Sequence, residues 1–163
     1  MNDDLLAAFA DQIALEQASA QAYLQMAAWA SAHDLSGTTA WLRAQAAEET
    51  GHALRFLDFV LDRGAEIRLQ ALAAPPADYD SVVAVFEAAL AHEQRVSQSI
   101  GDLYAAAQAA GDYQSLPLLS WFLAEQVEEE ASVRTILGEL RFAHADPTAL
   151  LLLDRELPTR RAA

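Results

Sequence analysis

The sequence predicts an all-α protein built as a four-helix bundle, with a long crossover between the second and third helices and a short fifth helix near the C-terminus. Apolar residues recur at intervals of three and four along four long stretches, which is the spacing of one buried helix face. The composition is 53% hydrophobic and 21% charged, with abundant alanine, and alanine favours helix. The 163-residue length suits a single domain over 1–163, with the bundle at about 4–144 and the fifth helix at about 147–157.

The first two helices are separated by a short break. Apolar residues keep a helical spacing over 4–32, and Asn2 or Asp3 is placed to cap the first turn. Ser36 can cap the second helix, which we expect to run to about Arg63, where Gly64 follows as a C-terminal stop. The short break predicts that these two helices are antiparallel neighbours.

Residues 64–80 form a long connection. They include Pro75 and Pro76 and show no sustained periodicity, so we expect an irregular segment of about 15 residues, which is long for a connection. The third helix begins near 80–81 and ends at Gly111. A connection of this length can cross the bundle, and it would leave the second and third helices parallel.

The fourth helix begins within 112–115 and continues to about His144. Pro117 is tolerable in its first turn, but would not be tolerated deeper in the helix. Asp146 and Pro147 then begin the fifth helix, TALLLLDREL. Its four consecutive leucines suggest docking against other subunits, although folding over one end of the same bundle explains them equally well.

The formal net charge of -14 restricts the kinds of partner that this chain can bind. Binding to the phosphates of nucleic acid or to an anionic membrane surface needs a basic patch, so we expect neither, and cations are the natural partners. The absence of cysteine excludes disulfides and thiolate metal sites. The N-terminal stretch MNDDLLAAFADQIALE is acidic where a signal peptide is basic, and no apolar run reaches transmembrane length, so we expect a cytoplasmic protein.

Acidic side chains lie on the stripes that the four long helices should bury. On the second helix, Glu49 and His52 share a face with Leu42 and Phe56. Each of the other three helices has a glutamate on the apolar stripe as well: Glu16, Glu93 and Glu129. Gln126 precedes Glu129 by one helical turn. Every helix therefore brings at least one acid toward the bundle axis.

Taken singly, each of these residues is more often a solvated residue at the edge of a helix face, and a lone histidine is more often a hydrogen-bonded core residue than a ligand. Together they would be unpaired buried charges that destabilise the fold, because no basic residue shares their stripes. Bound dications resolve this conflict, and four carboxylates balance two Fe(II) ions. Glutamates with one imidazole and no cysteine suit Fe(II) or Mn(II) better than structural zinc.

Four stretches carry a family resemblance: LEQASAQAYLQMAAWASAH (15–33), WLRAQAAEETGH (41–52), AHEQ (91–94) and WFLAEQVEEE (121–130). Over nearly its whole length the chain resembles the ferritin family, and specifically the non-haem bacterial ferritins. The Glu-x-x-His pair alone is weak evidence. Its coincidence with carboxylates on the other three helices and with the long crossover is highly specific.

The resemblance implies a ferroxidase centre with two iron ions. The implied ligands of the first iron are Glu16, Glu49 and His52. Glu49 bridges to a second iron held with Glu93 and Glu129, and Gln126 borders the site. The resemblance also implies a third iron position nearby, served by Glu48, Glu125, Glu128 and Glu129. A solvated acidic face explains Glu125 and Glu128 equally well. Tyr23 matches the family's tyrosine beside the centre, where it can supply an electron during oxygen reduction.

Two departures from related families are informative. The symmetric di-iron arrangement has Glu-x-x-His on two helices, whereas the fourth helix here offers Gln126-x-x-Glu129, so the second iron lacks an imidazole. This asymmetry fits a site through which iron passes as substrate. Bacterioferritins carry a haem-ligating methionine immediately after the glutamate of the second helix, and the residue here is Thr50, so we expect no haem.

The resemblance therefore implies an iron-storage protein with ferroxidase activity. It would oxidise Fe(II) with oxygen or peroxide and store the ferric mineral in a hollow homo-oligomeric shell of twenty-four subunits. One alternative is a soluble di-iron oxidase or peroxidase that retains its metal, although the absence of cysteine removes the rubredoxin-type site of rubrerythrins. Another is a metal-free helical interaction module whose acids lie at the surface.

Overall fold

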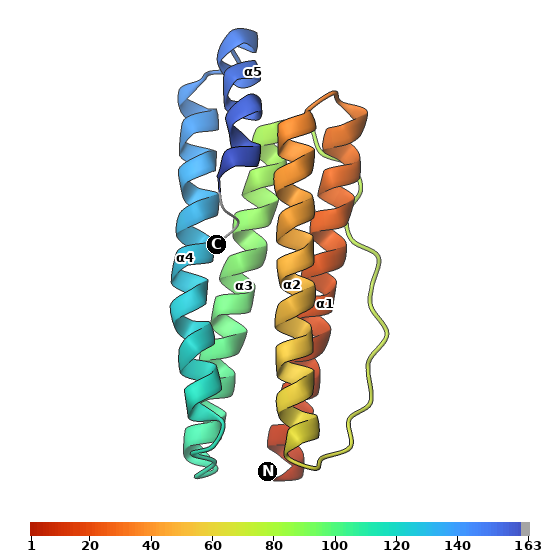
Figure 1. Ribbon diagram of the computed structural model, residues 1–163, viewed down its shortest axis with the longest axis vertical. Coiled ribbons are helices and arrows are strands. Elements are labelled where there is room, and N and C mark those ends of the chain that lie inside the picture. Colours follow the sequence, from red (N-terminus) through yellow and green to blue (C-terminus); the bar gives the residue numbers. More distant parts are fainter. Residues whose placement is uncertain (161–163) are drawn as a thin grey trace.

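The computed structural model describes residues 1–160, and the helices of this part of the chain form a bundle. Four long helices lie side by side along the long axis of the molecule (Figure 1). Their bounds are α1 Asp3–Ala32, α2 Ser36–Asp62, α3 Val82–Ala109 and α4 Leu116–Phe142. The shorter α5, Pro147–Glu156, leads into a 3-10 helix, η1, Leu157–Thr159. No strand occurs within residues 1–160, and the predicted fold class is confirmed.

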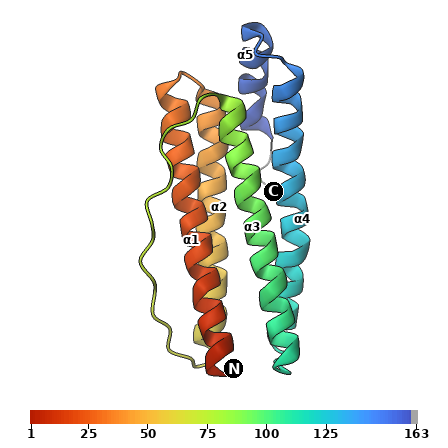
Figure 2. The ribbon, with the colours of Figure 1, turned by 180° about the vertical axis from the view of Figure 1, so that it is seen from behind.

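The connections give the bundle its topology. Short turns make α1 and α2 antiparallel, and likewise α3 and α4, while the long segment after α2 travels the length of the bundle outside α1 (Figures 1 and 2). Gln70 in this crossover donates a hydrogen bond from Nε2 to Oδ1 of Asp11 on α1, at 2.6 Å. Helices α2 and α3 therefore run in the same direction, as the sequence predicted. Within the described residues, no helix is both long enough and apolar enough to span a bilayer.

Several helix ends follow local sequence signals. The side chains of Asn2, Ser81 and Asp146 each accept a hydrogen bond from a backbone N–H in the first turn of α1, α3 and α5 respectively. Gly64 and Gly111 follow α2 and α3 with φ of 69° and 67°, which glycine adopts without the steric strain that a side chain would add. These caps and stops agree with the sequence analysis.

The start of α2 differs from expectation. Ser36 does not cap it: the residue at the N-cap is Leu35, which makes no side-chain cap. The carboxylate of Asp154 on α5 takes this role, accepting from the backbone N–H of Gly37 at 2.9 Å and of Thr38 at 2.7 Å. The Thr38 hydroxyl donates to the same carboxylate. A residue far along the chain therefore satisfies the free N–H groups of this helix, which no local pattern reveals.

The sequence left open whether α5 docks against other subunits or folds over its own bundle, and the structure answers part of this question. Leu150 and Leu153 pack against the core of the same bundle, and Leu157 of η1 is buried in it. Leu151 and Leu152 remain 49% and 55% exposed in the single chain. The helix therefore folds onto its own bundle and still presents two leucines outward.

The core consists of two apolar clusters with a polar layer between them. One cluster includes Trp41 and Phe86, and the other includes Phe9 and Phe56. The buried side chains between the clusters are mostly glutamates and glutamines, contributed by all four long helices. This arrangement places polar groups in the middle of the bundle, where water is excluded from both ends.

Removing the Asp154 cap should destabilise the protein. Asp154→Ala leaves two N–H groups of α2 without an acceptor, and the loss of an N-cap costs about 0.5–2 kcal/mol. Gly37→Ala should have the same sign, because its Cβ would lie 1.6 Å from the Asp154 carbonyl oxygen and α5 would have to shift. Thermal unfolding of the metal-free protein and hydrogen exchange at Gly37 and Thr38 measure both effects. Gly101→Ala is the matched control, because its Cβ would meet nothing within 4 Å.

Candidate metal centre

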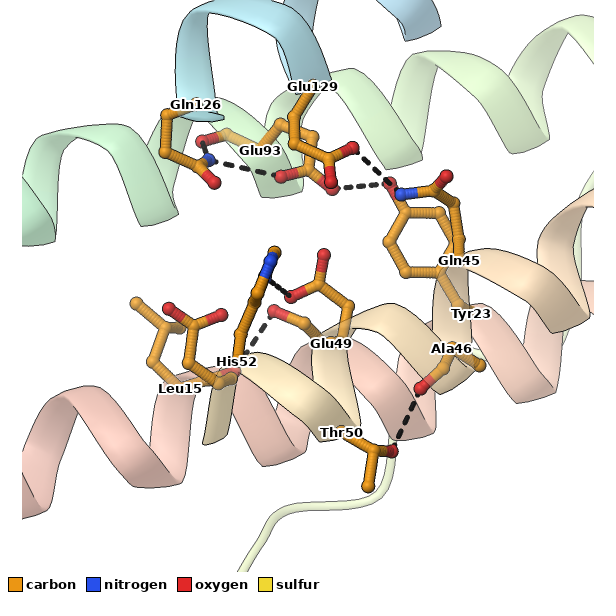
Figure 3. A network of polar contacts seen from close by, with 12 residues as sticks. Leu15, Tyr23, Gln45, Ala46, Glu49, Thr50, His52, Glu93, Gln126 and Glu129 are labelled. Atoms are coloured by element: carbon orange, nitrogen blue, oxygen red, sulfur yellow. Dashed lines mark hydrogen bonds and ion pairs between the residues drawn. The ribbon is translucent and has the colours of Figure 1, made fainter. Parts of the chain in front are cut away.

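The polar layer is made of acids that the four long helices turn toward the bundle axis. Glu16 of α1, Glu93 of α3 and Glu129 of α4 are completely buried, and Glu49 and His52 of α2 are nearly so. Figure 3 shows Glu49 and His52 pointing from α2 across the interior toward Glu93 and Glu129. Each acid occupies a position on an apolar helical stripe, which is why it enters the core instead of the solvent.

Two groups of side chains come close enough to share a metal ion. Glu16, Glu49 and His52 each offer a ligand atom, and these atoms lie within 4.8 Å of one another. Glu48, His52, Glu125 and Glu129 form a second group by the same measure. The two groups share His52, and Glu48 and Glu125 are half-buried between the centre and the surface. The structure therefore assembles most of the residues singled out from the sequence.

Two of the predicted ligands, Glu93 and Glu128, belong to neither group. Glu128 is exposed on α4, so its role at a third iron position stays a prediction. Gln126 donates from Nε2 to Oε2 of Glu93 at 3.2 Å and to the Glu93 carbonyl oxygen at 3.3 Å. It therefore lies beside the buried acids and holds Glu93, which the sequence analysis assigned to the second iron.

Hydrogen bonds to side chains hold three of the four buried glutamates. The Tyr23 hydroxyl donates to Oε1 of Glu93. Gln45 donates from Nε2 to Oε2 of Glu129 at 2.8 Å, and Gln12 donates to Oε1 of Glu16 at 2.7 Å. Gln12 and Gln45 were not identified from the sequence. Both precede a buried glutamate on the same helix by four residues, and this shared face was the available signal.

Several buried ligand atoms have no hydrogen-bond partner. They are Oε2 of Glu16, both carboxylate oxygens of Glu49, Nδ1 of His52 and Oε1 of Glu129. Unsatisfied groups of this kind are rare in folded proteins, because burial without a partner costs free energy. Without a cation, a proton on Glu16 that is donated to Glu49 is the alternative way of satisfying these oxygens. Dications bound among these side chains would satisfy them.

Burial and mutual repulsion strongly favour the protonated carboxyls when no metal is bound. Desolvation, followed by the charge of Glu93, raises the pKa of Glu49 to about 8 and that of Glu129 to about 10. Desolvation and then the charge of Glu49 raise the pKa of Glu16 well above its usual value. Burial and the Glu93 charge likewise raise the pKa of Tyr23. Without metal, bound protons therefore neutralise these carboxyls, and a dication must displace the protons in order to bind.

The surroundings make the centre dry on one side and accessible on the other. The His52 ring packs edge-on against Phe122 and Trp121, with ring centroids 5.3 Å and 5.9 Å away. Arg55 stacks its guanidinium over Trp121 at 3.7 Å. Glu48 and Glu125 flank His52 on the partly exposed side, so a cation approaching from there meets carboxylates first. Carboxylate oxygens with one imidazole suit Fe(II) or Mn(II).

Comparisons with known sequences agree with this geometry. The ferritin-like domain family matches residues 6–143. The chain is 36% identical over 149 residues to the bacterial non-heme ferritin of Escherichia coli O157:H7, covering 91% of this chain and 90% of that protein. It is also 36% identical over 160 residues to the bacterial non-heme ferritin of Staphylococcus aureus strain MRSA252, covering 98% and 96%.

Solved structures are similar over the whole chain. A closed form of the Archaeoglobus fulgidus ferritin, engineered by site-directed mutagenesis, superposes with a TM-score of 0.96 at 39% identity, covering 100% of this chain and 99% of that one. A humanized archaeal ferritin gives a TM-score of 0.97 at 38% identity, with the same coverage. The similarity extends through α5, beyond the residues matched by the family.

Proposed function

The chain belongs to the ferritin family, and on this premise we propose that its polar layer is the ferroxidase centre of an iron-storage protein. The protein oxidises Fe(II) to Fe(III) and stores the product as a ferric mineral. The observation that carries the proposal is the set of buried, unpartnered ligand atoms on Glu16, Glu49, His52 and Glu129. Iron is the substrate here and no haem takes part.

The ligand atoms divide into two neighbouring positions. Glu16, Glu49 and His52 hold the first iron, supported by their mutual proximity. Glu49 also reaches the second iron, because both of its oxygens lack a hydrogen-bond partner and each can bind one ion. Glu93 and Glu129 complete the second position. Glu48 and Glu125, with Glu128 farther out, serve a third position through which iron passes.

The reaction needs electrons and protons in matched numbers. Two Fe(II) ions give up two electrons, and dioxygen accepts them with two protons to form hydrogen peroxide. Peroxide can accept two more electrons and two more protons to form water. Tyr23, hydrogen-bonded to Glu93, can supply a further electron. The carboxyls lose their protons as iron binds, so no separate general base is needed.

Storage requires an enclosed space, which copies of this chain supply. The chain assembles as a homo-oligomer, and we assign it a shell of twenty-four subunits in the cytoplasm. A groove of about 660 Å³ between α4 and α5, with the exposed Phe142 and Leu152 at its wall, supports contact between subunits. The formal charge of -14 supports the attraction of Fe(II) to the shell.

Aerobic loading tests the function directly. When Fe(II) is added in large excess and the protein is separated by gel filtration, we expect iron far above a few ions per chain in a peak of shell size. Iron capped at about two ions per chain in a small oligomer would instead identify a retained di-iron cofactor, as in an oxidase or peroxidase. Protein that binds no metal, with a melting temperature unchanged by Fe(II) or Zn(II), would contradict a metal function altogether.

A further inference from the structure

The two carboxylate oxygens of Glu16 differ in their hydrogen bonding. Its Oε1 accepts the hydrogen bond from Nε2 of Gln12 at 2.7 Å, while its Oε2 is buried and has no hydrogen-bond partner. Gln12 lies one helical turn before Glu16 on α1 and is only 1% exposed. Water therefore cannot replace this contact, and one oxygen of the carboxylate is engaged before any metal arrives.

Gln12 is itself held in one orientation. The Ser99 hydroxyl of α3 donates to Oε1 of Gln12 at 2.6 Å, so the amide oxygen faces Ser99 and the amide nitrogen faces Glu16. A carboxylate that binds a metal is ionised and can only accept, so the opposite amide orientation would then set two acceptors against each other. The chain of contacts from Ser99 through Gln12 to Glu16 links α3 to α1 beside the centre.

The other buried glutamates differ from Glu16. Glu93 accepts hydrogen bonds at both of its oxygens, from Tyr23 and from Gln126. Both oxygens of Glu49 lack a hydrogen-bond partner, as a ligand shared between two ions requires. Gln45 holds one oxygen of Glu129, but the Oε1 atom of Gln45 has no partner of its own. Gln12 differs from Gln45 because a second side chain, that of Ser99, binds its amide oxygen and so fixes the orientation of the amide.

We propose that Gln12 is a positioning residue that occupies Oε1 of Glu16, leaving Oε2 as the single oxygen with which Glu16 binds iron. Ser99 keeps Gln12 in that orientation. The inference rests on the proposed function, since it concerns a ligand of the first iron position. It assigns a task to two residues that do not touch the metal, and it predicts that Glu16 is a one-oxygen ligand.

The test uses the full chain without iron, titrated anaerobically with Co(II). Working in a Glu129→Ala background removes one ligand from the group of Glu48, His52, Glu125 and Glu129, and leaves the group of Glu16, Glu49 and His52 complete. Gln12→Leu removes the amide at similar volume, and we expect Co(II) affinity to fall about 10- to 100-fold, the usual effect of losing a partner that supports a ligand. The visible Co(II) absorption should weaken as well, because a released carboxylate can bind through both oxygens and raise the coordination number.

Matched variants separate positioning from packing. Ser99→Ala should shift affinity and spectrum in the same direction as Gln12→Leu. Ser19→Ala removes another hydroxyl that links α1 to α3, through His92 at 2.6 Å, and should leave both readouts unchanged. Gln12→Leu indistinguishable from its parent, or Ser19→Ala matching Gln12→Leu, would overturn the positioning role. If Glu49→Ala did not reduce Co(II) binding by the otherwise unchanged protein, the proposed function itself would fail.

Discussion

Replacing Glu49 with glutamine should lower the initial rate of Fe(II) oxidation by more than about 100-fold, beyond the range expected for a residue that only supports a ligand. Both Glu49 oxygens are buried without hydrogen-bond partners, and one lies 3.6 Å from Nδ1 of His52. The amide has similar volume but carries no charge, and its nitrogen cannot bind a cation. Only one uncharged oxygen would remain to bind a cation, so the two iron positions would lose their shared ligand. Stopped-flow absorbance of the ferric product measures the rate.

The control for this experiment is a glutamate outside the centre. Glu87 of α3 is half exposed and pairs with Arg141 at 2.7 Å, so Glu87→Gln should oxidise Fe(II) at the rate of the unchanged protein. A Glu49→Gln variant that kept the full rate would show that the centre has been assigned to the wrong residues. Folding of the variant is checked by its helical circular dichroism.

The second large effect concerns the metal-free protein, whose stability should fall as the pH rises above the usual glutamate pKa of 4.5. Burial raises the pKa of Glu49 to about 8 and of Glu129 to about 10 in the folded state. Between the unfolded and folded values the folded chain holds more protons than the unfolded chain. The free energy of unfolding therefore decreases by about 1.4 kcal/mol per pH unit for each such carboxyl. The stabilisation is complete below pH 4.5 and is lost as the pH passes through the folded values.

Urea unfolding at several pH values, with a chelator present, measures this dependence. The Glu49→Gln variant should show a shallower decline between pH 4.5 and about 8, because it lacks one titrating group. Comparison with this variant removes the contribution of general repulsion in a chain of net charge -14. In a second series, with Zn(II) in place of the chelator, the trend should reverse, because Zn(II) binds the deprotonated ligands more tightly at higher pH. Identical slopes for the two proteins would contradict the raised pKa of Glu49.

The bundle was predictable because its signals are local. Helical periodicity, the glycine stops and the unusually long segment after the second helix each involve neighbouring residues, and together they determine the order and direction of the four long helices. The same periodicity revealed Glu16, Glu49, Glu93 and Glu129 as acids on buried stripes. It could show that they face the axis, but not how far apart their oxygens lie.

The features that the sequence did not reveal depend on contacts between distant residues. Ser36 has the right chemistry for a cap, but Asp154 fills the position from α5. Gln12 and Gln45 share a face with buried glutamates of their own helices, but Ser99 and Glu129, which they also contact, come from other helices. In each case the position of a residue on its own helix determines the face on which its side chain lies. The contact that distinguishes it comes from a second helix.

The contact between Asp154 and the start of α2 also has a consequence for the order of folding. Asp154 lies 116 residues beyond Thr38, so during synthesis α2 emerges and can pair with α1 long before its cap exists. Contacts between residues far apart in the chain are slow to form, because the entropy of loop closure is lost before the contact repays it. The helix that carries Glu49 and His52 therefore receives its final restraint only after α5 has been translated and has docked.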